Sequence, residues 1–120
     1  MSHEPSIFTR IMAREIPADI VYESDAVIAF RDIAPQAPVH ILVVPRTQVY
    51  ANVGELAAGD PALLAQLVAT ARTIAEQHCG GEYRLIFNTG ARAGQTVFHV
   101  HAHVLGAKPG ESLPEGSLGQ

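Results

Sequence analysis

Residues 97–105 alternate between histidine and apolar side chains, and this alternation constrains the fold more than any other part of the chain. The segment reads Val-Phe-His-Val-His-Ala-His-Val-Leu. Side chains of a β-strand point alternately to its two faces, so the histidines would share one face of a strand. The other face then carries Phe98, Val100, Ala102 and Val104. We therefore expect a strand whose apolar face packs on a helix and whose histidine face carries a site.

The remaining hydrophobic pattern predicts two helices and four more strands. A long helix is expected at 61–79, because Asp60 is a suitable N-cap, Pro61 suits the first helical position and Gly80 ends the pattern. The other expected elements are a short helix within 5–15 and strands at 20–23, 26–31, 39–44 and 83–87. Most of these strands follow one another closely. The pattern predicts an α+β domain on an antiparallel sheet of about five strands.

Length and composition restrict the class of protein. The 120 residues suit a single domain, expected at 1–108 with a flexible tail at 109–120, and 48% of them are hydrophobic. A net charge of −4 gives no basic stripe for a nucleic-acid polymer. No apolar run reaches the roughly 18 residues of a membrane span, and no signal peptide is apparent. The single cysteine, Cys79, favours a reducing compartment, and we expect a cytoplasmic protein.

The three alternating histidines allow three interpretations. Partly buried histidines that only bond one another are the least favoured, because unpaired buried imidazoles are costly. A zinc site is the second, with His40 as a possible fourth ligand, although the sequence from 83 to 110 contains no carboxylate. Nucleophilic catalysis on phosphorus is the third, and the preceding loop, with Gly90, Gly94, Gln95 and Thr96, suits an anion. His3 and His78 are assigned no role.

The sequence resembles the histidine triad family, in its branch of small nucleotide-binding purine phosphoramidate hydrolases. The resemblance covers about residues 7–106 and centres on His-x-His-x-His followed by two aliphatic residues, at 99–105. The flanking matches are Ile7-Phe8, Ile16-Pro17-Ala18, Phe30-Arg31-Asp32-Ile33, Pro35-Gln36-Ala37-Pro38, Asn88 and Gly94-Gln95-Thr96-Val97. Two residues differ from the branch, Thr96 in place of serine and Arg31 in place of a frequent histidine. The tail after Lys108 also lacks the branch's tryptophan-bearing ending.

The resemblance implies a role for each matching residue. His101 is then the nucleophile that attacks the α-phosphorus, His99 and His40 form a hydrogen-bonded chain that orients it, and His103 contacts phosphoryl oxygen and assists the leaving group. Asp32 takes the ribose hydroxyls, which a carboxylate can accept as hydrogen-bond donors. The implied phosphate and leaving-group side chains are Asn88, Gln95 and Thr96, with Gly94 and Val97 beside them. The implied base pocket is Ile7, Phe8, Phe30, Ile33 and Leu42, residues whose pattern alone also fits a plain core.

The implied activity is hydrolysis of the P–N bond of purine nucleoside 5′-phosphoramidates through a covalent nucleotidyl-histidine. No cofactor or metal is needed, and the third histidine favours hydrolysis over transfer. The implied partners are a purine nucleotide and a second copy of the chain, paired through the long helix and the strand at 83–87 into one continuous sheet. Three alternatives stay open: a dinucleoside polyphosphate hydrolase, a zinc-dependent or zinc-binding protein, and a nucleotide-binding regulatory protein with residual activity.

Overall fold

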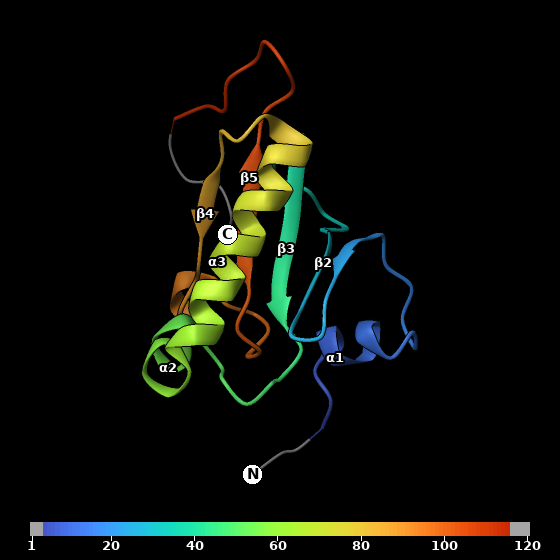
Figure 1. The fold of residues 1–120 in the computed structure, drawn as a ribbon, viewed down its shortest axis with the longest axis vertical. Helices are drawn as coiled ribbons and strands as arrows, with labels where there is room; N and C mark the ends of the chain where they lie inside the picture. The colour runs from blue at the N-terminus through green and yellow to red at the C-terminus, as the bar shows by residue number, and fades with distance from the viewer. Residues whose placement is uncertain (1–3, 116–120) are drawn as a thin grey trace.

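One antiparallel sheet, with strand order β1-β2-β3-β5-β4, organises the computed structural model, which describes residues 4–115 (Figure 1). Its strands are β1 (Ile20–Glu23), β2 (Val27–Arg31), β3 (Val39–Pro45), β4 (Arg84–Ile86) and β5 (Ala102–Gly106). The helices are α1 (Ile7–Met12), α2 (Val53–Gly59) and α3 (Pro61–Cys79), with a 3-10 turn, η1, at Ala91–Ala93. The predicted α+β fold with a five-stranded antiparallel sheet is confirmed.

The long helix α3 covers one face of the sheet (Figure 1). The Asp60 side chain accepts a hydrogen bond from Leu63 N and caps the start of the helix, while Gly80, at φ 67°, ends it in the left-handed conformation. The apolar stripe of α3 meets the inward side chains of β2, β3 and β5. This core contains Val27, Ala29, Ile41, Val43, Leu67, Ala71, Ile74, Ala75, Val100, Ala102 and Val104.

The opposite face of the sheet is only partly covered, by the short helix α1. Phe8 and Ile11 of α1 pack on Ile28, Phe30, Leu42 and Val44 and form a second, smaller core. His40 and His103 belong to this same face, because His40 lies on the Leu42 side of β3 and His103 pairs with Leu42 across the ladder. The face that carries the histidines therefore has an apolar floor beside it.

The strand predicted at 97–105 begins only at Ala102. Residues 97–101 have no strand partner, and Val100 N instead donates to Tyr50 O at 3.0 Å. Val100, Ala102 and Val104 reach the α3 core as predicted, whereas Phe98 is 56% exposed. The prediction for Phe98 was wrong because strand alternation does not hold where the backbone has left the sheet.

Helix α2 was not predicted, although its start has a sequence signal. The Asn52 side chain accepts from Glu55 N, and the Glu55 carboxylate accepts from Ala51 N, close to the reciprocal pattern of a capping box. The pair Asn52 and Glu55 is spaced as such a box requires. The alanines and glycines that follow gave too weak an apolar period to support the assignment.

The ends of the chain bear on two further predictions. Residues 109–115 contain neither helix nor strand, and the rest of the predicted tail, 116–120, lies outside the described residues, as does His3. The domain boundary at 108 stays a prediction. Within residues 4–115, no helix combines the length and apolar character needed to cross a membrane.

Candidate active site

A cavity of about 330 Å³ lies on the sheet face that carries α1. His101 and His103 line it together with predicted nucleotide-binding residues. These are Ile7, Phe8, Phe30, Asp32, Ile33, Leu42, Gly94, Thr96 and Val97. A larger hollow of about 630 Å³ lies between the end of α3, β4 and residues 107–113, and none of its lining residues is a predicted site residue. The fold thus gathers side chains from five separate segments around the smaller cavity.

His101 lies just before β5, and one of its ring nitrogens is hydrogen-bonded to the backbone. Its Nδ1 lies 2.8 Å from the His99 carbonyl oxygen, and since a carbonyl only accepts, Nδ1 is the protonated nitrogen. In the neutral ring, Nε2 therefore carries a lone pair. The Phe8 ring meets the imidazole edge-on with ring centroids 4.9 Å apart. Backbone and packing together hold His101 in the tautomer and orientation that a nucleophile at Nε2 requires.

His40 and His103 form a directed hydrogen-bonded pair. Gln36 N donates to His40 Nδ1 at 3.0 Å, so the proton of neutral His40 is on Nε2. That proton is donated to His103 Nδ1, 3.0 Å away. His103 then carries its own proton on Nε2, and its ring centroid is 5.2 Å from that of His101. The pair thus presents an N–H donor beside the His101 lone pair.

His99 contacts His101 through its backbone, while its ring packs behind Phe8 with ring centroids 5.6 Å apart. The imidazole is fully buried, donates from Nε2 to Pro45 O at 2.7 Å, and accepts at Nδ1 from the Ser6 hydroxyl at 2.6 Å. The His99 carbonyl is the group that orients His101. The hydrogen-bonded chain implied by the family resemblance is therefore divided in the structure, because His40 reaches His103 and only the His99 backbone reaches His101.

Burial keeps the histidines of the site neutral. Loss of solvent lowers the pKa values of His40, His99 and His101 below 6.5. The Asp32 charge acts in the opposite direction on His40 and His101, and backbone hydrogen bonds do so on His99 and His101, but burial has the larger effect. The pKa of His103 falls furthest, to about 4, because burial is reinforced by repulsion from His101 and His40. Uncharged imidazoles near neutral pH are what a nitrogen nucleophile and a neutral proton donor require.

The loop at 88–96 contributes some predicted residues to the cavity and not others. Gly94, at φ 95°, and Thr96 line it. Gln95 is buried and uses its amide within the loop, donating to Ala51 O and Val97 O and accepting from Gly90 N. Asn88 is half-buried at the end of β4 and is not among the lining residues. Gln95 therefore shapes the loop in this structure.

Asp32 and the predicted apolar residues form the other end of the cavity. Asp32 Oδ1 accepts from Ala34 N at 2.8 Å, and Oδ2 lies 3.5 Å from His40 Nε2. Phe8, Phe30 and Leu42 are buried, whereas Ile33 is 94% exposed and overhangs the rim. Arg31 also lines the cavity, although its guanidinium lies 3.1 Å from Asp19 and 3.5 Å from His78.

Four apolar lining residues were not among the predicted site residues. They are Ile11, Ile16, Pro17 and Ala18, from α1 and the connection to β1. The apolar spacing of α1 already gave Ile11 a buried side. Nothing in the spacing assigned the three connecting residues to a cavity, because a loop has no periodic face.

Asp32, His40 and His103 have ligand atoms within 4.8 Å of one another, a spacing that can hold a metal ion. The sequence argument against zinc, that no carboxylate is near, does not hold in three dimensions because Asp32 comes from a distant loop. The nitrogens that would bind the ion, however, are those that share the His40–His103 hydrogen bond. A metal there would displace the proton that fixes the His103 tautomer.

Comparison with known proteins gives consistent matches over most of the chain. The family model described as HIT domain matches residues 13–110. An uncharacterised HIT-like protein of Synechococcus elongatus is 55% identical over 106 residues, covering 88% of this chain and 92% of the relative. A protein of Escherichia coli K12 named purine nucleoside phosphoramidase is 47% identical over 108 residues, covering 88% and 90%.

A solved structure titled as a HIT family hydrolase, from Clostridium thermocellum, superposes on this fold with a TM-score of 0.81. It is 40% identical in sequence, and the match covers 93% of this chain and 98% of that one.

Proposed function

The chain belongs to the HIT domain family, and from this premise we propose that it hydrolyses the P–N bond of purine nucleoside 5′-phosphoramidates. The observation that carries the proposal is the complementary pair at the cavity, an unprotonated His101 Nε2 beside the His103 N–H. The name of the Escherichia coli relative supports the substrate class. A cavity with an apolar end and a carboxylate suits a base and a ribose.

The first step forms a bond between His101 Nε2 and the α-phosphorus and breaks the bond from phosphorus to the amine. The leaving nitrogen needs a proton, and we assign its donation to the Nε2–H of His103, whose ring centroid lies 5.2 Å from that of His101. The products are a nucleotidyl-imidazolium on His101, a free amine and a His103 ring that has lost its proton, whose negative charge the His40 N–H stabilises until water reprotonates the ring. The neutral state of His101 favours this step, because a protonated ring has no lone pair for attack.

The second step returns the enzyme to its starting state. Water attacks the phosphorus, the bond from phosphorus to His101 breaks, and the nucleoside monophosphate leaves. The proton lost by water replaces the one that His103 gave to the amine. The His99 carbonyl, which accepts from His101 Nδ1, stabilises the positive ring of the intermediate.

The other site residues position these two histidines or the nucleotide. His40 fixes the tautomer of His103, and the His99 backbone fixes that of His101. Asp32 is assigned to the ribose hydroxyls, and Phe8, Phe30, Leu42, Ile7 and Ile33 to the base. Gly94, Thr96 and Val97 are assigned to the phosphate, with Gln95 holding their loop and Asn88 at its base. No cofactor takes part, and the single cysteine, Cys79, favours the cytoplasm.

Replacement of the nucleophile tests this mechanism directly. We expect His101→Ala to lower turnover of an adenosine phosphoramidate by at least about a thousandfold, since nucleophile and intermediate are both lost. Binding of AMP, measured by calorimetry, should survive within about tenfold because the base and ribose contacts remain. Rapid quench of the wild-type enzyme in alkaline denaturant during turnover should trap a nucleotide on His101, seen by mass spectrometry, because the P–N bond of a phosphorylated imidazole is labile to acid. Wild-type turnover by His101→Ala would exclude the mechanism.

The same assay separates the remaining alternatives. A dinucleoside polyphosphate hydrolase would cleave diadenosine polyphosphates faster than phosphoramidates when both are offered side by side. A regulatory nucleotide-binding protein would bind AMP and turn over neither substrate appreciably. We expect the phosphoramidate to have the highest kcat/KM, because the His103 donor suits a basic amine leaving group.

A zinc protein is the second candidate, on the observation that Asp32, His40 and His103 are close enough to share an ion. Under the proposed mechanism, EDTA leaves activity unchanged, whereas added Zn²⁺ inhibits by replacing the proton between His40 and His103. A zinc-dependent enzyme would give the reverse results and would carry near-stoichiometric metal on purification. Elemental analysis with the two titrations decides between them.

A further inference from the structure

Residues 6–18 form one wall of the cavity, and we refer to this segment as the cap. It consists of α1 and the connection to β1, and it contributes the lining residues Ile7, Phe8, Ile11, Ile16, Pro17 and Ala18. Figure 1 shows α1 lying beside the lower end of the sheet, outside the layer that α3 forms. A helix of six residues is too short to be stable by itself. The position of the cap therefore depends on how it is attached to the sheet.

The first attachment is polar and joins the start of the cap to a histidine of the triad. The Ser6 hydroxyl donates to His99 Nδ1 at 2.6 Å and also accepts from Thr9 N as the cap of α1. Ser6 N and the Thr9 hydroxyl both donate to Gln48 Oε1, at 2.8 and 2.7 Å. The buried His99 ring thus ties the beginning of α1 to the end of β3 through Pro45 O.

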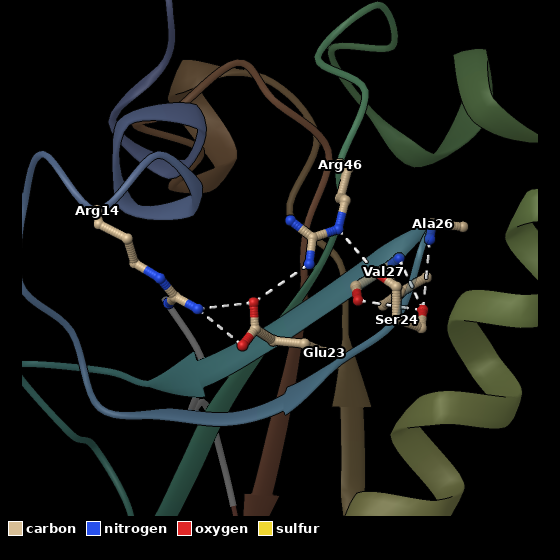
Figure 2. Close-up of polar contacts among 6 residues, drawn as sticks. All are labelled: Arg14, Glu23, Ser24, Ala26, Val27 and Arg46. Carbon is tan, nitrogen blue, oxygen red and sulfur yellow. Dashed lines mark hydrogen bonds and ion pairs between the residues drawn. The ribbon is translucent and has the colours of Figure 1, made fainter.

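The second attachment is ionic and follows the end of α1 (Figure 2). Both oxygens of Glu23, on β1, accept from Arg14 Nη2 at 2.8 and 2.9 Å, and Arg46 approaches the same carboxylate at 3.3 Å. Arg46 also donates from Nε to Ser24 O at 2.7 Å, which connects the group to the turn between β1 and β2. The two arginines lower the pKa of Glu23, so the carboxylate stays charged.

Arg14 adopts a backbone conformation that arginine ordinarily avoids. Its φ is 62°, and the bonds Arg14 N to Ile11 O and Glu15 N to Arg10 O complete a helix-ending motif in which glycine is the usual residue. A glycine there would make the turn more easily but would have no side chain for Glu23. The chain therefore places at the end of α1 a residue whose ion pair offsets the unfavourable backbone.

We propose that the cap is a gate for the nucleotide, and that Ser6 and Glu23 are positioning residues that hold it closed. The proposal rests on the proposed function, since the cap closes the cavity assigned to the nucleotide. The reasons are geometric: the cap carries six lining residues, has a polar attachment at each end of α1 in addition to its apolar packing, and places Phe8 on the His101 ring. Weakening either attachment raises the fraction of molecules in which the cavity is open, without altering the reacting atoms of His101 and His103.

The test compares Ser6→Ala and Glu23→Gln with the wild type. We expect each to raise the dissociation rate of AMP, measured by stopped-flow displacement, by about threefold to tenfold, in proportion to one lost hydrogen bond or ion pair. Amide hydrogen exchange should quicken in residues 6–18 and stay unchanged in α3. For an adenosine phosphoramidate, KM should rise while kcat changes less than about twofold, since neither variant alters His101 or His103.

Two further variants serve as controls. Ser6→Thr keeps a hydroxyl at the same place and should restore wild-type rates. Glu15→Gln removes an exposed ion pair of the same kind, with Arg10 at 3.4 Å, that lies inside the cap and makes no attachment to the sheet. It should leave AMP dissociation unchanged. Ser6→Ala leaves a buried nitrogen of His99 without a donor, so Glu23→Gln, at an exposed position, keeps the test independent of folding.

Unchanged AMP dissociation and unchanged exchange in both Ser6→Ala and Glu23→Gln would overturn the gate. A loss of kcat without a change in AMP dissociation would overturn it as well, since the residues would then act on chemistry. Failure of the wild-type protein to bind AMP would refute the nucleotide function itself, and hydrogen exchange on the free protein would still report whether the two attachments hold the cap.

Discussion

Each histidine of the site has a single hydrogen-bonding assignment that follows from its neighbours. Pro45 O and the Ser6 hydroxyl determine which ring nitrogen of His99 carries the proton, and the His99 carbonyl does the same for His101. Gln36 N determines the protonated nitrogen of His40, which in turn determines that of His103. Four identical side chains thereby have different hydrogen-bond partners and protonated nitrogens. The difference comes from the backbone groups that each ring meets, which explains why residue type alone could not distinguish them.

Stability is expected to fall in mild acid because the site histidines are neutral in the folded state. Their pKa values are lowered, that of His103 from 6.5 to about 4, so the unfolded chain binds more protons between these limits. For His103, the stabilisation is fully retained above pH 6.5 and decreases as the pH falls toward 4, by up to about 1.4 kcal/mol of unfolding free energy per pH unit. The lowered pKa values of His40, His99 and His101 add to the decrease below pH 6.5. Urea unfolding at a series of pH values measures this slope.

His103→Asn provides the comparison for that slope. It removes the group with the widest pH window, so the dependence between pH 6.5 and 4 should become shallower, whatever the variant's stability at pH 7. An equal slope in wild type and variant would mean that His103 does not titrate as the structure requires.

At the scale of elements, the end of α3 packs on the end of β5 with no space for a side chain on Gly106. A Cβ placed there would lie 2.5 Å from Cys79 Sγ and 2.6 Å from Cys79 Cβ. The end of the long helix is therefore in tight contact with β5 at this point. The same contact explains the burial that raises the pKa of the Cys79 thiol.

Gly106→Ala should reduce the free energy of unfolding by about 1–3 kcal/mol through overpacking against Cys79. In a Cys79→Gly background both clashing atoms are gone, and the same substitution should cost much less. Denaturant unfolding of the four proteins of this double-mutant cycle gives the coupling between the two positions. Additive effects would contradict the close approach of α3 to β5.

A helix or strand could be predicted from the sequence where the signals that begin, continue and end it lie within its own residues. Helix α3, with Asp60 and Gly80 at its ends, and the buried strand β3 were expected almost to their observed bounds. The start of β5 was not, because whether residues 97–101 pair depends on a partner strand: β3 ends at Pro45, and Tyr50 O takes the N–H of Val100 instead. The pattern of residues 97–105 cannot show where the partner strand, which is far away in the sequence, ends.

For the whole molecule, we propose that two copies pair through α3 and β4. Strand β4 is at the edge of the sheet and, within residues 4–115, pairs with β5 alone. Beside it, the outer face of α3 and Tyr83 line a shallow groove, in which Ala65, Val68 and Ala69 are followed by the polar residues Arg72, Thr73 and Glu76. An edge strand next to small apolar side chains suits a two-fold interface in which each copy extends the other's sheet.

Val68→Arg should convert a dimer into a monomer, because Val68 is 37% exposed on this face and the interface would bury a charged guanidinium there. Light scattering after size-exclusion chromatography measures the mass. Val49→Arg is the control, since Val49 is more exposed and lies on neither α3 nor β4. A wild-type monomer, or a dimer that persists in Val68→Arg, would refute the interface.

The sequence by itself determined the fold class, the long helix and the face of β5 on which His103 lies, because strand and helix periods are properties of neighbouring residues. It also indicated most of the cavity, through the resemblance to the histidine triad family. Only the tertiary structure decided which histidine bonds which, that Asp32 lies beside His40, and that residues 16–18 line the cavity. These are contacts between segments far apart in the chain, and no local period encodes them.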